Sequence, residues 1–225
     1  MEGVGESQHA VTGTEYLTLE QAFEYFNDKL FYEQFGNRLP ACLITYDRGR
    51  THYGYFAPGR FQHRRAPHVL SDEIALNPDG FYGRSDREIL STLVHEMVHM
   101  HQCHYGKPGR GRYHNQEWAD MMESIGLMPS ATGQPGGLKT GERVSHYILT
   151  DGLFNHVVQE LCMAGLHLNW QSGFARNTER QRVLLRTARN KTKFHCAHCG
   201  QNAWAKPTAH LICGDCRWRM TSYAG

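Results

Sequence analysis

The chain has 225 residues, of which 40% are hydrophobic and 20% charged, and its formal net charge at pH 7 is +2. This length allows one sizeable hydrophobic core with a smaller second unit. The absence of an uninterrupted run of about 18 apolar residues argues against a transmembrane helix, and the first residues lack the basic and apolar regions of a signal peptide. We therefore expect a cytoplasmic protein with no membrane partner.

The charge is distributed unevenly along the chain. Residues 1–170 carry 14 Lys/Arg and 20 Asp/Glu, whereas residues 171–225 carry 10 Lys/Arg and 2 Asp/Glu. An acidic body of −6 with a basic tail of +8 indicates a polyanionic partner for the tail.

The pattern of apolar residues predicts an α+β fold. Residues 1–15 are polar and glycine-rich, which predicts a disordered N-terminus. A capping box from Thr18 to Gln21 predicts a helix over residues 18–35. Three short β-rich segments, separated by Gly, Pro and Arg, predict the strands of a small sheet: residues 41–46, 52–57 and 72–77.

A second capping box, from Ser85 to Glu88, predicts a long helix over residues 85–105. Gly106 and Pro108 end this helix. The remaining elements are predicted as a helix over 115–127, a loop over 130–142, a strand over 144–150, a helix over 154–166 and a short basic helix over 178–190.

The long helix carries the pattern H-E-x-x-H at His95, Glu96 and His99. Residues four apart on a helix lie one above the other, so the two imidazoles point to the same side and can bind one zinc ion. Glu96 lies about 100° round the helix and can reach a water molecule on that ion. The alternative is a histidine-rich helix with two partly buried, hydrogen-bonded imidazoles.

A catalytic zinc site needs a third protein ligand and one open position. His101 and His104 face away from the ion on the same helix. The loop after the helix can bring His114 back over the first two histidines, and we favour His114 as the third ligand. Glu117, on the next helix, is the second candidate.

The motif "HEMVH", followed after fourteen residues by His114 in "YHNQEW", resembles the SprT-like zinc metallopeptidases, which include the eukaryotic protease Spartan. The resemblance extends through the N-terminal helix and the strands to "FHCAHCGQNAW…HLICGDC", which is similar to the ribbon of bacterial members. It implies a minigluzincin-like fold and action on proteins associated with DNA. It also implies that His95, His99 and His114 bind zinc and that Glu96 is catalytic.

Such a site hydrolyses peptide bonds because zinc lowers the pKa of its bound water to about 7. Glu96 takes the water proton and later delivers it to the departing amine. A further donor usually stabilises the oxyanion, and three residues are candidates for this role: Tyr113, His146 and Tyr147.

Two C-x-x-C pairs, thirteen residues apart, lie near the end of the chain: Cys196, Cys199, Cys213 and Cys216. Four thiolates complete a tetrahedral shell and leave no place for water or substrate, which predicts a structural zinc site. Two disulfides are the alternative, which the lack of a secretion signal disfavours. We therefore expect one catalytic and one structural zinc ion, and no organic cofactor.

The predicted domains are a SprT-like metallopeptidase domain (16–170), a basic linker or helix (171–193) and a four-cysteine zinc ribbon (194–225). Five basic residues precede the ribbon: Arg182, Arg186, Arg189, Lys191 and Lys193. The arginines share one helix face, where like charges disfavour an isolated helix, so an anion is expected alongside. Trp204 and Trp218 would stack on bases if exposed. We expect DNA as the partner; the alternative is a solvated basic face.

Two functions of different class fit these motifs. The first is a zinc endopeptidase that its ribbon places on DNA, with DNA-associated or DNA-crosslinked proteins as substrates. The second is a non-proteolytic zinc-containing nucleic-acid-binding or transcription-related protein with a structural H-E-x-x-H site. A purely structural site has no use for a carboxylate beside the metal, so Glu96 favours the peptidase.

Overall fold

The computed structural model describes residues 11–48, 52–173 and 192–222. These residues form two compact units, one ending at Ser172 and one beginning at Gly173. The division lies close to the boundary that we predicted at residue 170. The larger unit has helices and two sheets, and the described part of the smaller unit has one sheet. The predicted α+β class is confirmed.

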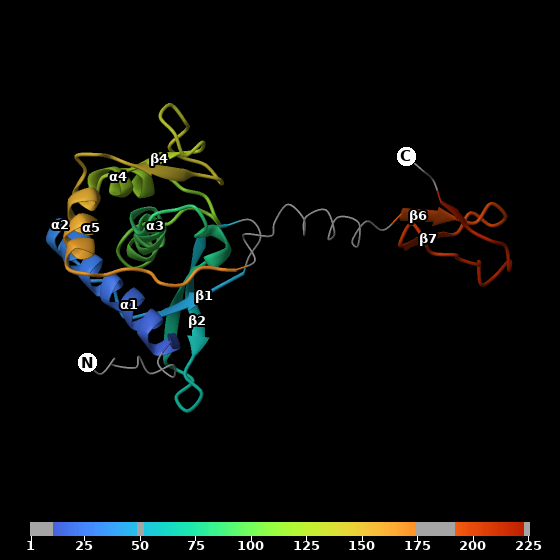
Figure 1. The fold of residues 1–225 in the computed structure, drawn as a ribbon, viewed down its shortest axis with the longest axis horizontal. Helices are drawn as coiled ribbons and strands as arrows, with labels where there is room; N and C mark the ends of the chain where they lie inside the picture. The colour runs from blue at the N-terminus through green and yellow to red at the C-terminus, as the bar shows by residue number, and fades with distance from the viewer. Residues whose placement is uncertain (1–10, 49–51, 174–191, 223–225) are drawn as a thin grey trace, which may run out of the picture. The chain divides into compact units, whose positions relative to one another are not determined.

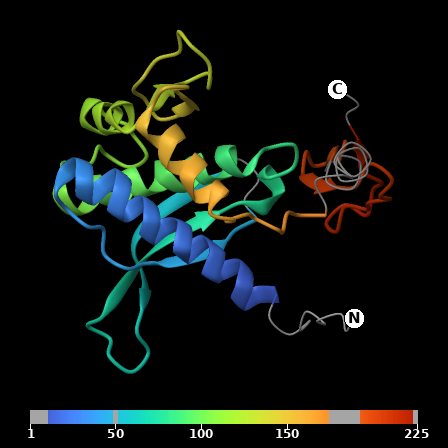
Figure 2. The same cartoon turned by 60° about the vertical axis from the view of Figure 1, so that its left-hand side comes forward.

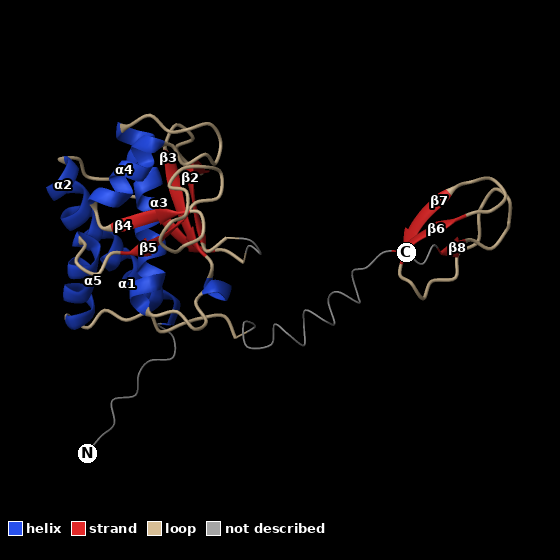
Figure 3. Ribbon diagram, turned by 90° about the horizontal axis from the view of Figure 1, so that it is seen from above, coloured by secondary structure: helices blue, strands red, loops and turns tan. Residues whose placement is uncertain are grey.

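Helix α3 forms the centre of the larger unit, with the three-stranded sheet on one side and helices α1 and α5 on the other (Figures 1 and 3). The elements in chain order are α1 (Val11–Phe26), a π-helical turn (Asn27–Tyr32), α2 (Glu33–Phe35), β1 (Leu43–Tyr46), β2 (Gly54–Gln62), β3 (Leu70–Leu76), a 3-10 turn (Pro78–Gly80), α3 (Asp86–Tyr105), α4 (Gln116–Ser124), β4 (Leu127–Ser130), β5 (Ser145–Ile148) and α5 (Leu153–Met163).

The start of α3 is fixed by the predicted capping box, which is confirmed. The Ser85 side chain accepts a hydrogen bond from the Glu88 backbone N–H, and the Glu88 carboxylate accepts one from the Ser85 N–H. Because α3 is covered on both sides, its apolar residues Leu90, Leu93 and Met97 have no exposed surface. This burial fixes the rotation of the helix, and therefore the direction in which its histidines point.

The first sheet has the strand order β1-β3-β2, with β1 parallel and β2 antiparallel to β3. The predicted three strands are confirmed, but β2 and β3 form a longer hairpin that projects from the unit (Figure 2). The register shifts between Ala57 and Phe61, where Gly59 adopts a left-handed φ of 57°. This β-bulge interrupts the alternation of apolar residues, which explains why the sequence predicted a shorter strand.

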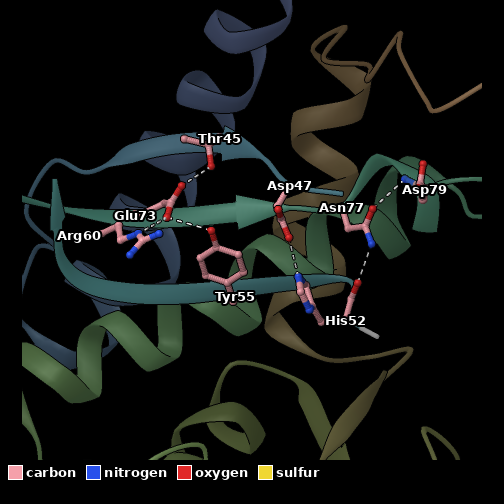
Figure 4. Close-up of polar contacts among 8 residues, drawn as sticks. All are labelled: Thr45, Asp47, His52, Tyr55, Arg60, Glu73, Asn77 and Asp79. Carbon is pink, nitrogen blue, oxygen red and sulfur yellow. Dashed lines mark hydrogen bonds and ion pairs between the residues drawn. The ribbon is translucent and has the colours of Figure 1, made fainter. Parts of the chain in front are cut away.

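A buried carboxylate joins the three strands on the outer face of this sheet (Figure 4). Glu73 on β3 accepts hydrogen bonds from Thr45 Oγ1 of β1 at 2.6 Å and from the Tyr55 hydroxyl of β2 at 3.0 Å. Arg60 Nε of the hairpin lies 3.8 Å from the same carboxylate. A buried charge needs such partners, so Glu73 fixes the strands relative to one another at the root of the hairpin.

The predicted start of the first helix is wrong. Helix α1 begins at Val11, so residues 11–15, predicted as disordered, are helical, and Thr18 lies inside the helix instead of capping it. Tertiary contacts extend the helix: the buried Glu15 carboxylate accepts a hydrogen bond from the Tyr46 hydroxyl at 2.7 Å. A contact with a residue 31 positions away is not visible in local sequence propensity.

The second sheet was only half predicted. Strand β5 and helix α5 are confirmed, but residues 127–130 form β4, which pairs antiparallel with β5. The sequence predicted the end of a helix and a loop here, because Gly126 and Pro129 are breakers; Pro129 fits in this two-stranded ribbon because each strand has a free edge. Among the described helices, none has both the length and the apolar composition needed to cross a bilayer.

The smaller unit is a three-stranded antiparallel sheet of β6 (Thr192–His195), β7 (Asn202–Ala205) and β8 (Thr221–Ser222), with β6 in the middle. Lys193, which we assigned to the basic linker, therefore belongs to this unit, where it pairs with Trp204 across the strands. Strand β6 begins at Thr192, two residues before residue 194, where we predicted the start of the ribbon. The other four predicted basic contacts lie outside the described residues: Arg182, Arg186, Arg189 and Lys191.

Candidate functional site

Three histidines meet beside α3. His95 and His99 point from successive turns of the helix, and His114 comes from the loop before α4; one ring nitrogen of each lies within 4.8 Å of those of the other two. The backbone N–H and carbonyl of His114 both bond to Gly141, at 2.8 and 3.0 Å. This bridge anchors the loop that returns the chain to α3.

Glu117, the second candidate for the third ligand, lies elsewhere. Its carboxylate accepts hydrogen bonds from Gln102 Nε2 and from the Lys107 backbone N–H, both at 2.7 Å. It thereby holds the first residues of the loop against the end of α3. The structure brings His114, and not Glu117, to the histidine pair.

Hydrogen bonds determine which nitrogen of His95 faces the cluster. The Ser91 hydroxyl donates its only hydrogen to the Glu88 carbonyl at 2.8 Å, so it accepts from His146 Nε2 at 2.9 Å. Burial lowers the pKa of His146 to about 4, so this imidazole is neutral and its Nδ1 has no hydrogen. That Nδ1 lies 3.1 Å from Nδ1 of His95 and accepts its hydrogen. Nε2 of His95 is therefore left with a free lone pair.

The same logic applies to His114, whose Nδ1 donates to the Gly141 carbonyl at 3.0 Å and leaves Nε2 as an acceptor. Burial lowers the pKa of all three cluster histidines, and that of His99 to about 3. The cluster thus consists of neutral imidazoles, and outer hydrogen bonds orient two of them. Zinc prefers ligands of this kind held in this way, so the residues fit a zinc ion.

Trp118 packs against all three rings. It lies on α4, four residues after His114, is fully buried, and its ring centroid is 4.9, 5.2 and 4.4 Å from those of His95, His99 and His114. Its indole forms an apolar floor that restricts the imidazoles and excludes water from beneath them. Sequence reasoning missed both Trp118 and the role of His146.

Glu96 is nearly inaccessible, with 7% of its surface exposed, and lies between α3 and β2. Burial raises the pKa of its carboxyl to about 8, although the Phe56 backbone N–H bonds to it and opposes the shift. The close approach of β2 requires a glycine: a Cβ on Gly54 would lie 2.8 Å from the Ala75 carbonyl oxygen and 3.4 Å from Glu96 Cγ. A carboxyl with a pKa near neutrality can both accept and return a proton.

Other predicted residues have different places. His146 bonds to His95 and Ser91, so it is not available as the oxyanion donor that we considered. His104 faces away, as expected, and its Nε2 lies 2.6 Å from an Asp72 carboxylate oxygen. Tyr113 is exposed in the loop between α3 and α4.

The four predicted cysteines of the smaller unit also come together, with their sulfur atoms within 4.8 Å of one another: Cys196, Cys199, Cys213 and Cys216. Backbone N–H groups of Cys199 and His198 point to Cys196 Sγ and lower the pKa of this thiol to about 7. Hydrogen bonding with Cys199 raises the pKa of Cys216 to about 12, so the case for a metal site rests on the convergence of the four sulfur atoms. The group fits a closed tetrahedral zinc site.

The two C-x-x-C turns repeat one backbone design. Gly200 N–H bonds to the Cys196 carbonyl at 2.9 Å, and Arg217 N–H bonds to the Cys213 carbonyl at 2.8 Å. Both donors are left-handed, with φ of 76° and 56°. Arg217 therefore bears a conformation that glycine adopts without strain.

A model of the SprT-like family matches residues 19–137 of the chain. The chain belongs to the SprT-like family. It is also 42% identical over 59 residues to an uncharacterized protein in the mucB 3′ region of Salmonella typhimurium, which corresponds to 26% of this chain and 73% of that protein. The SprT-like match includes the three histidines and Glu96, whereas Gly141, His146 and the four cysteines lie beyond its end.

In this SprT-like chain, replacing His146 with alanine is expected to weaken zinc binding at the histidine cluster by a factor of about 10 to 100. The reason is that Nδ1 of His95 loses its acceptor and the ring loses its fixed tautomer. The measurement is competition with a chelator of known affinity, monitored by zinc release. His156→Ala, an exposed histidine on α5, is the control; equal zinc affinity in both variants would contradict the hydrogen-bonded role.

Proposed function

We propose that this SprT-like chain is a zinc-dependent endopeptidase that acts on proteins associated with, or crosslinked to, DNA. The observation that carries the peptidase is the combination of three converging neutral imidazoles with the buried Glu96 carboxyl next to His95 in the sequence. A site that only holds the chain together needs the imidazoles but has no role for the acid. The minigluzincin-like fold remains part of the proposal.

Each residue of the site has a defined task in peptide hydrolysis. A zinc ion bound by the imidazoles would supply a Lewis acid that makes water more acidic and polarises the substrate carbonyl. Glu96 accepts the proton of the attacking water at its carboxylate and later donates it to the amine nitrogen that leaves. The Phe56 N–H holds the carboxyl of Glu96 in place, and Trp118 covers the side of the imidazoles on which it packs.

The association with DNA is supported by the surface of the smaller unit. Trp204 and Trp218 are 60% and 61% exposed, so their rings are available for stacking on bases. Basic residues surround them in the sequence and in the sheet: Lys193, Lys206, Arg217 and Arg219. Together with the +8 charge of residues 171–225, these features favour a nucleic acid.

Removing residues 173–225 is expected to leave the cleavage of small unstructured peptides intact and to reduce the cleavage of a DNA-bound basic protein. The histidine cluster and Glu96 lie in the retained unit, whereas the tether that raises the local substrate concentration is lost. Both assays are run on both chains, with and without DNA. Equal cleavage of the DNA-bound protein by both chains would contradict the tethering role. Zinc and DNA binding by the full chain without any peptide cleavage would instead favour the non-proteolytic alternative.

A further inference from the structure

The β2–β3 hairpin carries a concentration of positive charge on an otherwise acidic unit. Residues 59–70 contain three arginines and two histidines and no Asp or Glu, whereas residues 1–170 have a net charge of −6. The basic residues are Arg60, His63, Arg64, Arg65 and His68, and all are exposed. The hairpin projects from the larger unit in both ribbon views (Figures 1 and 2).

The hairpin is firmly attached at its root. Asp72 accepts a hydrogen bond from the Gly59 backbone N–H at 2.7 Å and contacts His104 Nε2 of α3 at 2.6 Å. Arg60 reaches back to Glu73 (Figure 4). At the tip, backbone bonds join His63 N–H to the Val69 carbonyl and Val69 N–H to the Ala66 carbonyl, both at 2.9 Å. The projection therefore presents its side chains from an ordered backbone.

The two arginines at the tip have no counter-charge among the described residues. Neither Arg64 nor Arg65 takes part in an ion pair within residues 11–48, 52–173 and 192–222. Charges on an edge strand often serve only to prevent strand pairing between molecules, and Arg60 and the bulge fit this explanation. Arg64 and Arg65 do not, because they follow Gln62, the last residue of β2, where no strand edge needs protection.

We propose that this hairpin is a second DNA contact, in which Arg64 and Arg65 bind phosphates of duplex DNA. A two-stranded ribbon has the width that the major groove admits, and arginine is suited to phosphate. Duplex DNA, rather than an acidic protein, is the partner favoured by charge complementarity, since the same chain carries a second basic surface in its tail and one extended polyanion can contact both. The proposal rests on the proposed association with DNA but not on peptidase activity.

The test compares two full-length, zinc-loaded double variants that lose the same charge. Arg64→Ala/Arg65→Ala removes the unpaired arginines, and Lys29→Ala/Arg38→Ala removes two cations that pair with Glu33 and Asp28. Binding to a duplex oligonucleotide is measured over a salt titration. Loss of two phosphate contacts is expected to reduce the slope of log affinity against log salt by about 1.8 in the hairpin variant, with the control unchanged.

Additional variants and measurements separate a loss of DNA contact from a loss of folding. Arg64→Lys/Arg65→Lys is expected to restore the slope, which shows that charge rather than the fold is responsible, and equal melting temperatures check folding. A wild-type slope in the hairpin variant would overturn the hairpin contact. If removing residues 173–225 then abolished DNA binding, the proposed binding of DNA by the tail would still be supported. Equal slope losses in both double variants would also overturn it. Loss of polyglutamate binding with unchanged DNA binding would identify an acidic protein as the partner instead.

Discussion

Replacing Glu96 with glutamine is expected to reduce peptide hydrolysis by a factor of about 10² to 10⁴ without loss of zinc. An amide has nearly the same size as the carboxyl but cannot accept the proton of the attacking water. Glu96 is not among the three residues whose ring nitrogens converge, so the metal ligands stay unchanged. Single-turnover cleavage of an unstructured peptide and metal analysis of the same sample provide the measurement.

The matched control is Glu123→Gln, because Glu123 is a partly exposed glutamate whose carboxylate pairs with Lys139 at 2.8 Å, away from the cluster. It is expected to cleave the peptide at the wild-type rate. Near-normal turnover by the Glu96 variant would show that another group takes the proton. Loss of zinc from that variant would show that the carboxylate holds the metal.

Replacing His114 with alanine is expected to lower the zinc content from two ions per chain to one. The two remaining imidazoles come from one helix and leave two coordination positions to water, whereas the four thiolates of the smaller unit are unaffected. In the wild-type chain, a chelator should remove the histidine-bound ion first, because three neutral imidazoles hold zinc less tightly than four thiolates. Metal analysis after dialysis measures both effects.

Glu117→Ala is the comparison for this experiment, since Glu117 is the other residue that the sequence offered as third ligand. It is expected to keep two zinc ions, because its carboxylate bonds to Gln102 and Lys107. If the Glu117 variant loses one ion and the His114 variant does not, the ligand assignment is wrong. A wild-type chain with only one zinc ion would contradict the second site.

The parts of the fold that were predictable have local causes. The capping box at Ser85 sets the start of α3, and the breakers after Tyr105 set its end. Each signal spans only a few consecutive residues, so both ends were predictable from the sequence. In contrast, Glu15 near the start of α1 bonds to Tyr46, and β4 pairs with residues 145–148. Such long-range contacts override local propensity, and they cannot be predicted from the residues of one segment alone.

The residues of the candidate site also differ in whether local spacing or long-range contacts place them. The spacing of His95, His99 and the cysteines follows from one helix and two tight turns, so these residues were recognisable from sequence. His146 lies 51 positions from His95, and its role becomes visible only when β5 is paired with β4. The arginine pair at the hairpin tip was missed for a different reason. The charge was summed over residues 1–170, and the negative total concealed the local positive charge of the hairpin.

Within residues 192–222, the core of the smaller unit has only four buried residues: Phe194, Cys196, Cys213 and Met220. Two of these are cysteines of the candidate zinc site, so little apolar packing is left to hold the two turns together, and Arg217 adds strain. A core this small does not offset the conformational entropy of some thirty residues without a bound metal. The larger unit has its own extensive core and has no such dependence. On the proposed role, zinc scarcity severe enough to empty the four-thiolate site would therefore detach the protein from DNA by unfolding its anchor, while the larger unit, which has already lost its more weakly held ion, keeps its fold.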